Sequence, residues 1–165
     1  EELMVAASDN NVDMVKELMM KGFSVNFPDE SGFSAFKYAC GQGSIDVVKY
    51  IIDQDEADIN YCDEKSMPPL ILAAKNAQDE VLECLLNGGA DANVKDHNGR
   101  TALHIVCHSG RSEPALKLIE IGADIDSIDM KGNSAIFYGA RQNHDGIVAM
   151  LLQKGATTRY FNSDE

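Results

Sequence analysis

The stretch Gly99-Arg100-Thr101-Ala102-Leu103-His104-Ile105-Val106 recurs along the chain in altered form. Its step from turn to helix returns at a nearly constant interval, at Ser34, Pro68, Thr101 and Ser134. Counting back one further interval from Phe36 leads to Leu3, which begins the same pattern of apolar and small residues. A fixed period of this length is typical of repeat proteins. We therefore expect five repeats, the first without its leading turn.

A second apolar stretch follows the first in every repeat, a short distance further along. These stretches are Val12–Met19, Ile45–Ile52, Val81–Leu86, Ala115–Ile119 and Ile147–Leu152. Two apolar stretches per repeat predict two amphipathic helices. Glycines suited to a left-handed helix C-cap follow the second helix, at Gly22, Gly89, Gly122 and Gly155. The turns between the two helices are predicted at breakers such as Gly41-Gln42-Gly43 and Ser109-Gly110.

Asp-x-x-Gly turn chemistry precedes the later first helices. It is present as Asp96-His97-Asn98-Gly99 and Asp129-Met130-Lys131-Gly132, and as Asp63-Glu64-Lys65-Ser66 with serine in place of glycine. Short extended pieces around such a turn predict a hairpin-like finger, which projects away from the helix pair. The finger ends at a Ser, Thr or Pro, residues that cap or begin a helix. We expect the Asp carboxylate to cap the turn of its own finger.

The repeated segment resembles the ankyrin repeat, whose signature is T-P-L-H-x-A at a period of about 33 residues. The residues Gly99–Val106 and Leu118–Asp126 carry the likeness, and five matches in register cover nearly the whole chain. The resemblance implies an all-α fold, an ankyrin-repeat solenoid of stacked helix-turn-helix units with hairpin-like finger loops. We expect a single ankyrin-repeat domain over residues 1–165, with repeats at 1–28, 29–62, 63–95, 96–128 and 129–161 and a short tail at 162–165.

Single positions depart from the family pattern. The histidine of the signature is present only as His104, and its place is taken elsewhere by Met4, Lys37, Ile71 and Phe137. Ser66 replaces the glycine of its turn, and the segment from Asp53 to Ala57 carries one extra residue. We expect the junction over residues 53–67 to be the least regular part of the chain, and the end repeats to open first.

The charge balance limits the kinds of partner. The chain carries 14 Lys and Arg against 27 Asp and Glu, a formal net charge of −13. An acidic surface repels a phosphate backbone, so we expect no nucleic-acid partner. No apolar run approaches the roughly 20 residues that span a bilayer, so we expect no membrane insertion. We expect the chain to be monomeric.

The four cysteines are spread widely and evenly along the chain, unlike the closely paired ligands of a zinc site. Cys40 and Cys107 occupy a small-residue position of the first helices, where we expect them to fill the core, and Cys84 falls on an apolar helix stripe. Cys62 is the one we expect to be accessible. Free buried cysteine fits a reducing compartment, so we expect an intracellular protein, cytoplasmic rather than nuclear.

Patterns that would support catalysis or metal binding are weak. His104 and His108 stand at positions i and i+4, but no further ligand is fixed nearby and the Glu of an H-E-x-x-H motif is absent. Gly41-Gln42-Gly43 follows a predicted helix and lacks the Gly-Lys-Ser/Thr of a phosphate loop. There is no G-x-S-x-G elbow for a nucleophile. We expect no enzyme activity, no catalytic residue, no metal site and no cofactor.

The resemblance implies a binding surface on the concave face, formed by the finger tips and the solvent-facing ends of the first helices. By register its members are Glu30, Ser31, Phe33, Gln42, Glu64, Lys65, Met67, Lys75, Asn76, His97, Asn98, Arg100, His108, Ser109, Met130, Lys131, Asn133, Arg141 and Gln142. Counted with Lys95 and Asp9, this face has six cations against three anions, or against seven when the finger Asp residues are included. A partner segment that is acidic, or mixed acidic and apolar, fits this bias. The strongest contacts are expected at Phe33, Met67, Arg100 and Met130.

Two functions remain open on these grounds. One is a non-catalytic module that binds a partner protein through the concave face of the array. The other is a regulatory or substrate-recruiting ankyrin domain excised from a larger multidomain enzyme. A chain that starts inside a first helix, without Met and without a preceding turn, favours an origin in a longer protein.

Overall fold

The computed structural model describes residues 1–62 and 67–158. Over these residues the chain forms ten α-helices and no strand, apart from one isolated bridge between Ile128 and Ser134. The expected all-α fold is confirmed. Contacts divide the chain into two compact units, unit 1 at Glu1–Ala90 and unit 2 at Asp91–Glu165. The expectation of one domain over 1–165 stays a prediction.

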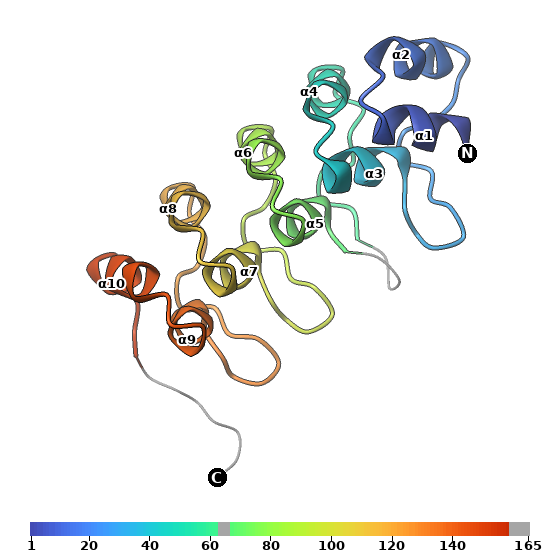
Figure 1. The fold of residues 1–165 in the computed structure, drawn as a ribbon. Helices are drawn as coiled ribbons and strands as arrows, with labels where there is room; N and C mark the ends of the chain where they lie inside the picture. Colours follow the sequence, from blue (N-terminus) through green and yellow to red (C-terminus); the bar gives the residue numbers. More distant parts are fainter. Residues whose placement is uncertain (63–66, 159–165) are drawn as a thin grey trace. The chain divides into compact units, whose positions relative to one another are not determined.

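Unit 1 is built from three helix pairs. Its helices are α1 (Glu2–Ser8), α2 (Val12–Met20), α3 (Ala35–Gln42), α4 (Ile45–Asp53), α5 (Pro69–Lys75) and α6 (Asp79–Asn87). The first helices α1, α3 and α5 pack in one row, and the second helices α2, α4 and α6 pack in another. The loop that leads into α3 projects from the row of first helices (Figure 1).

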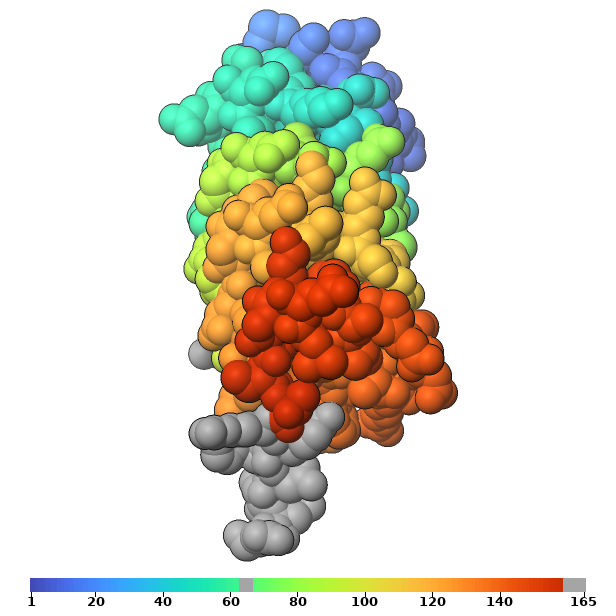
Figure 2. Space-filling view, turned by 90° about the vertical axis from the view of Figure 1, so that its left-hand side faces the viewer, coloured from blue at the N-terminus to red at the C-terminus, as the bar shows by residue number. Residues whose placement is uncertain are grey.

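Unit 2 repeats this plan with two helix pairs. Its helices are α7 (Ala102–His108), α8 (Ser112–Glu120), α9 (Ala135–Arg141) and α10 (Asp145–Gln153). Helix α7 packs on α9 and α8 on α10. In the space-filling view the colours of this unit follow one another in bands, because residues close in sequence stay close in space (Figure 2). Such local packing is the property of a stacked repeat.

The core of both units lies between the two helices of a pair and between neighbouring pairs. Val15, Leu70, Leu103 and Leu118 are among the side chains buried there, and burial of each aliphatic side chain of this size contributes roughly 1.5–3 kcal/mol. The cysteine predictions are confirmed in part by this packing. Cys40 and Cys107 are buried, Cys84 is half-buried and Cys62 is exposed. Burial raises the pKa of the Cys107 thiol to about 12.

Residues in the left-handed conformation follow the second helices at the positions that the sequence predicts. Gly22, Gly89, Gly122 and Gly155 all have positive φ, and Asp55 takes the same conformation after α4. Aspartate is one of the few residues other than glycine that tolerates this region. Asp55 thus takes the place of the glycine in this part of the junction, and residues 63–66 of the junction lie outside the described residues.

The predicted turn at Gly41-Gln42-Gly43 is shorter than expected. Helix α3 continues through Gln42, and only Gly43, with φ of 83°, forms its left-handed C-cap. Gly41 is instead a buried helical residue, where a Cβ would lie 3.1 Å from Leu72 Cδ2. A single glycine there thus permits close packing between α3 and α5. The other predicted breaker, Ser109-Gly110, does follow α7, and Gly110 has positive φ.

Side-chain amides and a carboxylate fasten one repeat to the next behind the fingers. Asn26 accepts a hydrogen bond from the Asp58 N–H (3.0 Å) and donates one to the Glu56 carbonyl (2.7 Å). Asn93 accepts from the Asp124 N–H (2.7 Å) and donates to the Gly122 carbonyl (3.3 Å). Asp126 accepts from the Thr157 N–H (2.8 Å). These bonds pair backbone groups of the loops that follow the second helices.

Replacement of Asn93 by Ala should therefore loosen unit 2. The change removes both bonds to the following repeat, and we expect it to lower the free energy of unfolding by about 1 kcal/mol. Urea denaturation followed by circular dichroism measures the change. Gln153→Ala, at the exposed end of α10, is the matched control and should shift the free energy by less than about 0.5 kcal/mol. Equal effects of the two variants would contradict the role given to Asn93.

Candidate protein-interaction surface

Each described finger is organised by the carboxylate at its start. In the finger that begins at Asp29, Oδ1 accepts hydrogen bonds from the backbone N–H groups of Ser31 (2.8 Å) and Phe33 (2.9 Å). Asp96 binds the N–H groups of Asn98 and Arg100 in the same way, both at 2.9 Å. Asp129 does so with Lys131 and Asn133, both at 2.8 Å. The expected capping of the turn by its own Asp is thus present in all three.

The second oxygen of each carboxylate accepts a hydrogen bond from a side chain, which fixes the position of the finger. Tyr38 Oη donates to Asp29 Oδ2 (2.9 Å) and Tyr138 Oη to Asp129 Oδ2 (2.7 Å). Both tyrosines stand at position i+9 from their Asp, on a first helix. In the finger at Asp96 the partner is Arg100 instead, whose Nε and Nη2 reach Asp96 Oδ2 at 2.9 and 2.7 Å.

These bonds keep the finger carboxylates ionised. Burial would raise the pKa of Asp96, but the Arg100 side chain and the N–H groups of Arg100 and Asn98 outweigh it and lower the pKa below its ordinary 3.8. The Phe33 N–H is the largest of several influences that lower the pKa of Asp29. For Asp129, the hydrogen bonds likewise outweigh burial and the pKa is lowered. Each finger is therefore built around a charged group.

His104 connects the start of its own helix to the next finger. Its Nδ1 accepts from the Thr101 N–H (3.1 Å), while Nε2 lies 3.1 Å from the Asn133 carbonyl. Because a carbonyl can only accept, Nε2 carries the proton. A second link joins the same two fingers, since the Met130 N–H donates to the Asn98 carbonyl (2.9 Å). The two fingers of unit 2 are thus fixed to one another.

Most of the predicted surface residues are exposed. These are Glu30, Ser31, Gln42, Lys75, Asn76, His97, Asn98, His108, Ser109, Met130, Lys131, Arg141 and Gln142. Phe33, Met67, Arg100 and Asn133 are half-buried. Glu64 and Lys65 lie outside the described residues. The pattern of exposure fits the helix ends and finger tips, but it does not by itself test binding.

Several of these residues already have partners inside the protein. Arg100 is forked onto Asp96, and Asn133 donates to Asp129 Oδ2 (3.3 Å). Asn76 donates to the Gly41 carbonyl (2.8 Å), and the Phe33 ring packs on Tyr38 with centroids 5.5 Å apart. Their side chains therefore stabilise the fingers and helix ends in addition to forming part of the surface.

Residues that the sequence reasoning missed are those that hold the surface in place. Tyr38 and Tyr138 follow their Asp at the same spacing, 29–38 and 129–138, and this match is a signal in the sequence. Asn26, Asn60, Asn93 and Asp126 also recur at the repeat period. Both signals are repeat-wide spacings between polar residues, which a search for apolar periodicity passes over.

The two units carry different charges on this surface. In unit 1 the described members include Glu30 and Lys75, and Asp9 lies at the end of α1. In unit 2 the exposed cations are Lys131 and Arg141, beside Lys95, whose Nζ donates to the Ile128 carbonyl (3.0 Å). Met130 adds a large apolar side chain that is 76% exposed. Among the described residues, most of the cations that were predicted on this surface therefore lie in unit 2.

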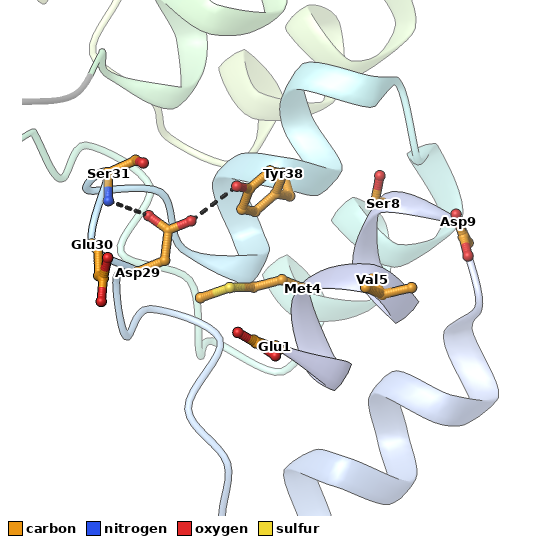
Figure 3. Close-up of a pocket in the computed structure, with 9 residues that line it drawn as sticks. All are labelled: Glu1, Met4, Val5, Ser8, Asp9, Asp29, Glu30, Ser31 and Tyr38. Atoms are coloured by element: carbon orange, nitrogen blue, oxygen red, sulfur yellow. Dashed lines mark hydrogen bonds between the residues drawn. The ribbon is translucent and has the colours of Figure 1, made fainter.

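Unit 1 has a cavity of about 690 Å³ on the finger side of α1 (Figure 3). It lies between α1 and the finger that begins at Asp29. Met4 points from α1 toward Asp29, whose carboxylate also accepts the hydrogen bond of the Tyr38 hydroxyl (2.9 Å). A different cavity, of about 540 Å³, lies between the second helices α4 and α6, with Lys49 and Glu83 among its lining residues.

Neither metal binding nor membrane insertion finds a site among the described residues. No group of three or more His, Cys, Asp or Glu side chains there could hold a metal ion. None of the helices in this part of the chain is long and apolar enough to cross a membrane.

Paired helices joined by carboxylate-capped fingers, repeated at a nearly constant interval, define a helical repeat protein. The family model of ankyrin repeats in three copies matches residues 3–96 and again residues 70–162. The chain belongs to the ankyrin-repeat family, as its resemblance predicted.

Curated relatives share these repeats within proteins of diverse size. The chain is 29% identical over 146 residues to a probable 26S proteasome regulatory subunit p28 of Saccharomyces cerevisiae. The match covers 83% of this chain and 62% of the yeast protein. A transient receptor potential cation channel subfamily A member 1 homolog of Caenorhabditis elegans is 29% identical over 93% of this chain and 13% of its own length. The E3 ubiquitin-protein ligase KEG of Arabidopsis thaliana is 23% identical over 76% of this chain and 8% of its own length. The chain thus spans less than two thirds of each.

Membership of this family carries a general function. Ankyrin repeats typically mediate protein–protein interaction, and the family is generally non-catalytic. A relative named as a ligase matches over only 8% of its length, so its name says nothing of the repeats.

Arg100→Ala should destabilise unit 2, because it leaves the buried Asp96 carboxylate without its side-chain partner. We expect the free energy of unfolding to fall by about 1–3 kcal/mol. Arg141→Ala, at the exposed end of α9, is the matched control and should change it by less than about 0.5 kcal/mol. Urea denaturation of both variants provides the comparison. If Arg100→Ala leaves the free energy of unfolding unchanged, the ion pair contributes nothing to stability.

Stability should also fall as the pH drops below the ordinary imidazole pKa. Burial is the main cause that lowers the pKa of His104 from 6.5, so the folded chain resists a proton that the unfolded chain accepts. Stability is therefore complete above pH 6.5 and declines as the pH falls from there toward the lowered value. The finger carboxylates, whose pKa values are lowered, act only in more acidic solution.

Unfolding free energies at about pH 7.5 and about pH 5.5 measure this dependence. His104→Gln should remove it, while the exposed His97→Gln should keep it. A dependence that persists in His104→Gln would assign it to another group.

Proposed function

We propose that this chain is a non-catalytic module that binds a partner protein through its fingers and the exposed ends of its first helices. The observation that carries the proposal is that the fingers, which bear exposed side chains, are held in a fixed geometry. The finger backbone is bound to a buried or half-buried carboxylate, and the two fingers of unit 2 are bound to each other. A surface that is ordered before binding loses little conformational entropy when a partner arrives.

The chemistry of unit 2 supports an acidic, or mixed acidic and apolar, partner segment. Met130 is exposed at the tip of its finger, with Lys131 beside it and Arg141 at the end of α9. An apolar group next to cations suits a segment that combines a large apolar side chain with carboxylates. Because Arg100 is already paired with Asp96, Lys131 and Arg141 are the main cations that contact the carboxylates of the partner.

The remaining parts of the proposal concern state and context. We propose a monomeric, intracellular module, cytoplasmic rather than nuclear, that needs no cofactor and binds neither nucleic acid nor membrane. The net charge of −13 supports the exclusion of nucleic acid. Buried thiols at Cys40 and Cys107 support a reducing compartment.

A second candidate function is a regulatory or substrate-recruiting domain within a larger enzyme. The likeness to an E3 ubiquitin-protein ligase, of which the chain spans 8%, favours it. The sequence of the full protein decides between the two, and both use the same binding surface.

The binding surface is tested with peptides selected from a random display library against the whole chain. Their affinities are measured by fluorescence anisotropy for the parent and for a Met130→Ala, Lys131→Glu double variant. We expect the double variant to lose at least about tenfold, equivalent to about 1.4 kcal/mol, for peptides that contain carboxylates and a large apolar residue. Its melting temperature should match that of the parent, since both residues are exposed.

Leu152→Ala, on the exposed side of α10, is the control for this experiment. It should leave affinity unchanged. If the selected peptides bind the double variant with full affinity but no longer bind Leu152→Ala, the binding site lies on the second helices instead.

A further inference from the structure

The second helices α4 and α6 of unit 1 border a cavity of about 540 Å³, which we call the α4/α6 groove. All of its lining residues belong to α4, to α6 or to the C-cap of α6, so it is separate from the fingers. Its half-buried lining residues are Ile45, Ile52 and Cys84, and the exposed ones include Lys49, Asp53 and Glu80.

Two small residues of α6 and its C-cap keep this groove open. Cys84 stands at the position where the other second helices have Glu17, Tyr50, Lys117 and Met150. Gly88 stands at the position that is elsewhere Lys21, Gln54, Ile121 and Lys154. With φ of −80°, Gly88 does not need a left-handed conformation, and a Cβ there would lie 3.0 Å from Ile52 Cγ2. The position of Ile52 is apolar in every second helix, so small size rather than apolar lining distinguishes this groove.

The preceding pair of second helices, α2 and α4, shows what occupies the equivalent space. There Tyr50 of α4 takes the position of Cys84, and the Nζ of Lys16 of α2 lies 5.0 Å from the centroid of the Tyr50 ring. Such a contact between a cation and an aromatic ring is favourable. Lys49 holds in α4 the position that Lys16 holds in α2. The α4/α6 groove thus has the lysine of this contact and a thiol in place of the ring.

The charges around the Cys84 thiol favour a basic occupant. Burial is the main cause that raises the pKa of this thiol, while Lys49 lowers the pKa and Asp53 raises it. The thiol is therefore neutral near pH 7 and acts as a small apolar group between two charges. Asp53, Glu80 and Glu83 line the groove, against Lys49 as the one cation among its described lining residues. Neither Asp53 nor Glu80 belongs to the two ion pairs found in the described part of the chain.

We propose that the α4/α6 groove binds a segment of a partner protein that combines an aromatic residue with Lys or Arg. The aromatic ring lies over Cys84 and against Lys49, as in the equivalent contact between α2 and α4. The basic side chains of the segment face Asp53 and Glu80, where an acidic segment would be repelled. The proposed function uses the fingers and first helices, so this inference adds a second binding surface on the second helices of unit 1.

The probes are three fluorescein-labelled synthetic peptides of equal length. The first has a central Tyr between Arg residues, the second has Ala in place of the Tyr, and the third has Glu in place of every Arg. We expect the whole chain to bind the first peptide at least about tenfold more tightly than either of the others, as measured by fluorescence anisotropy. Affinity for the first peptide should fall as salt is added, because exposed charges are screened.

A substitution that fills the groove from within tests the site without a change of charge. Cys84→Tyr supplies the ring that Tyr50 supplies in the preceding groove, so it should weaken binding of the first peptide at least about tenfold. Its melting temperature should match that of the parent, because α4 already carries a tyrosine at this position. Met150→Tyr, at the same position of α10 and also half-buried, is the matched control and should bind with unchanged affinity.

A second pair of variants separates the groove from the acidity of the whole chain. Glu80→Lys should weaken binding of the first peptide about tenfold. Glu113→Lys, at the same exposed position of α8 in unit 2, changes the net charge by the same amount. It should alter affinity less than about twofold.

Several outcomes would overturn the inference. They are no binding of the first peptide, full affinity in Cys84→Tyr, and equal losses with Glu80→Lys and Glu113→Lys. If Cys84→Tyr melts at a lower temperature than the parent, the comparison of Glu80→Lys with Glu113→Lys decides alone. The Met130→Ala, Lys131→Glu variant should bind the first peptide normally, whatever becomes of the finger surface. Loss of the peptide in that variant would place it on the fingers and also overturn the inference.

Discussion

A carboxylate that accepts hydrogen bonds from its own finger is the interaction on which the rest of this surface depends. A turn that projects from the helices has backbone N–H groups with no helical partner, and each unpaired group costs free energy where water is excluded. One Asp oxygen binds two of these groups, and the other binds a tyrosine or arginine side chain. Because the lowered pKa values keep these carboxylates ionised, the bonds are charge-assisted and hold the finger in one shape.

The fixed fingers explain how a stack of short helices can bind a partner selectively. The helices bury the apolar residues, so what remains for recognition is the charge and the shape of the finger tips and helix ends. In unit 2 these tips combine Met130 with Lys131. In unit 1, Glu30 holds the finger position of Met130 and lines the cavity beside α1 together with Asp9. Different side chains on a common framework thus give each unit its own surface chemistry.

Much of the fold could be predicted from the sequence because the repeat period and its punctuation are local signals. The Asp-x-x-Gly turns and the left-handed glycines both follow from residue types at fixed spacing. The site was harder to predict, since a long side chain at a surface position can turn inward. Arg100 folds back onto Asp96, and Gly41 remains in its helix because Leu72 packs against it. The cavity beside α1 joins residues from α1 and from the loop between α2 and α3, which only their arrangement in space reveals.

Amide hydrogen exchange of the free chain tests most directly whether buried carboxylates fix the fingers. The amides of Phe33, Arg100 and Asn133 lie in loops, yet each donates to an Asp oxygen. They should exchange slowly, like amides of the first helices, whereas the exposed loop amide of Glu30, which has no hydrogen bond among those found, should exchange quickly. Exchange of the three amides at the rate of an unstructured peptide would show that the fingers are not held, and would contradict a preformed binding surface.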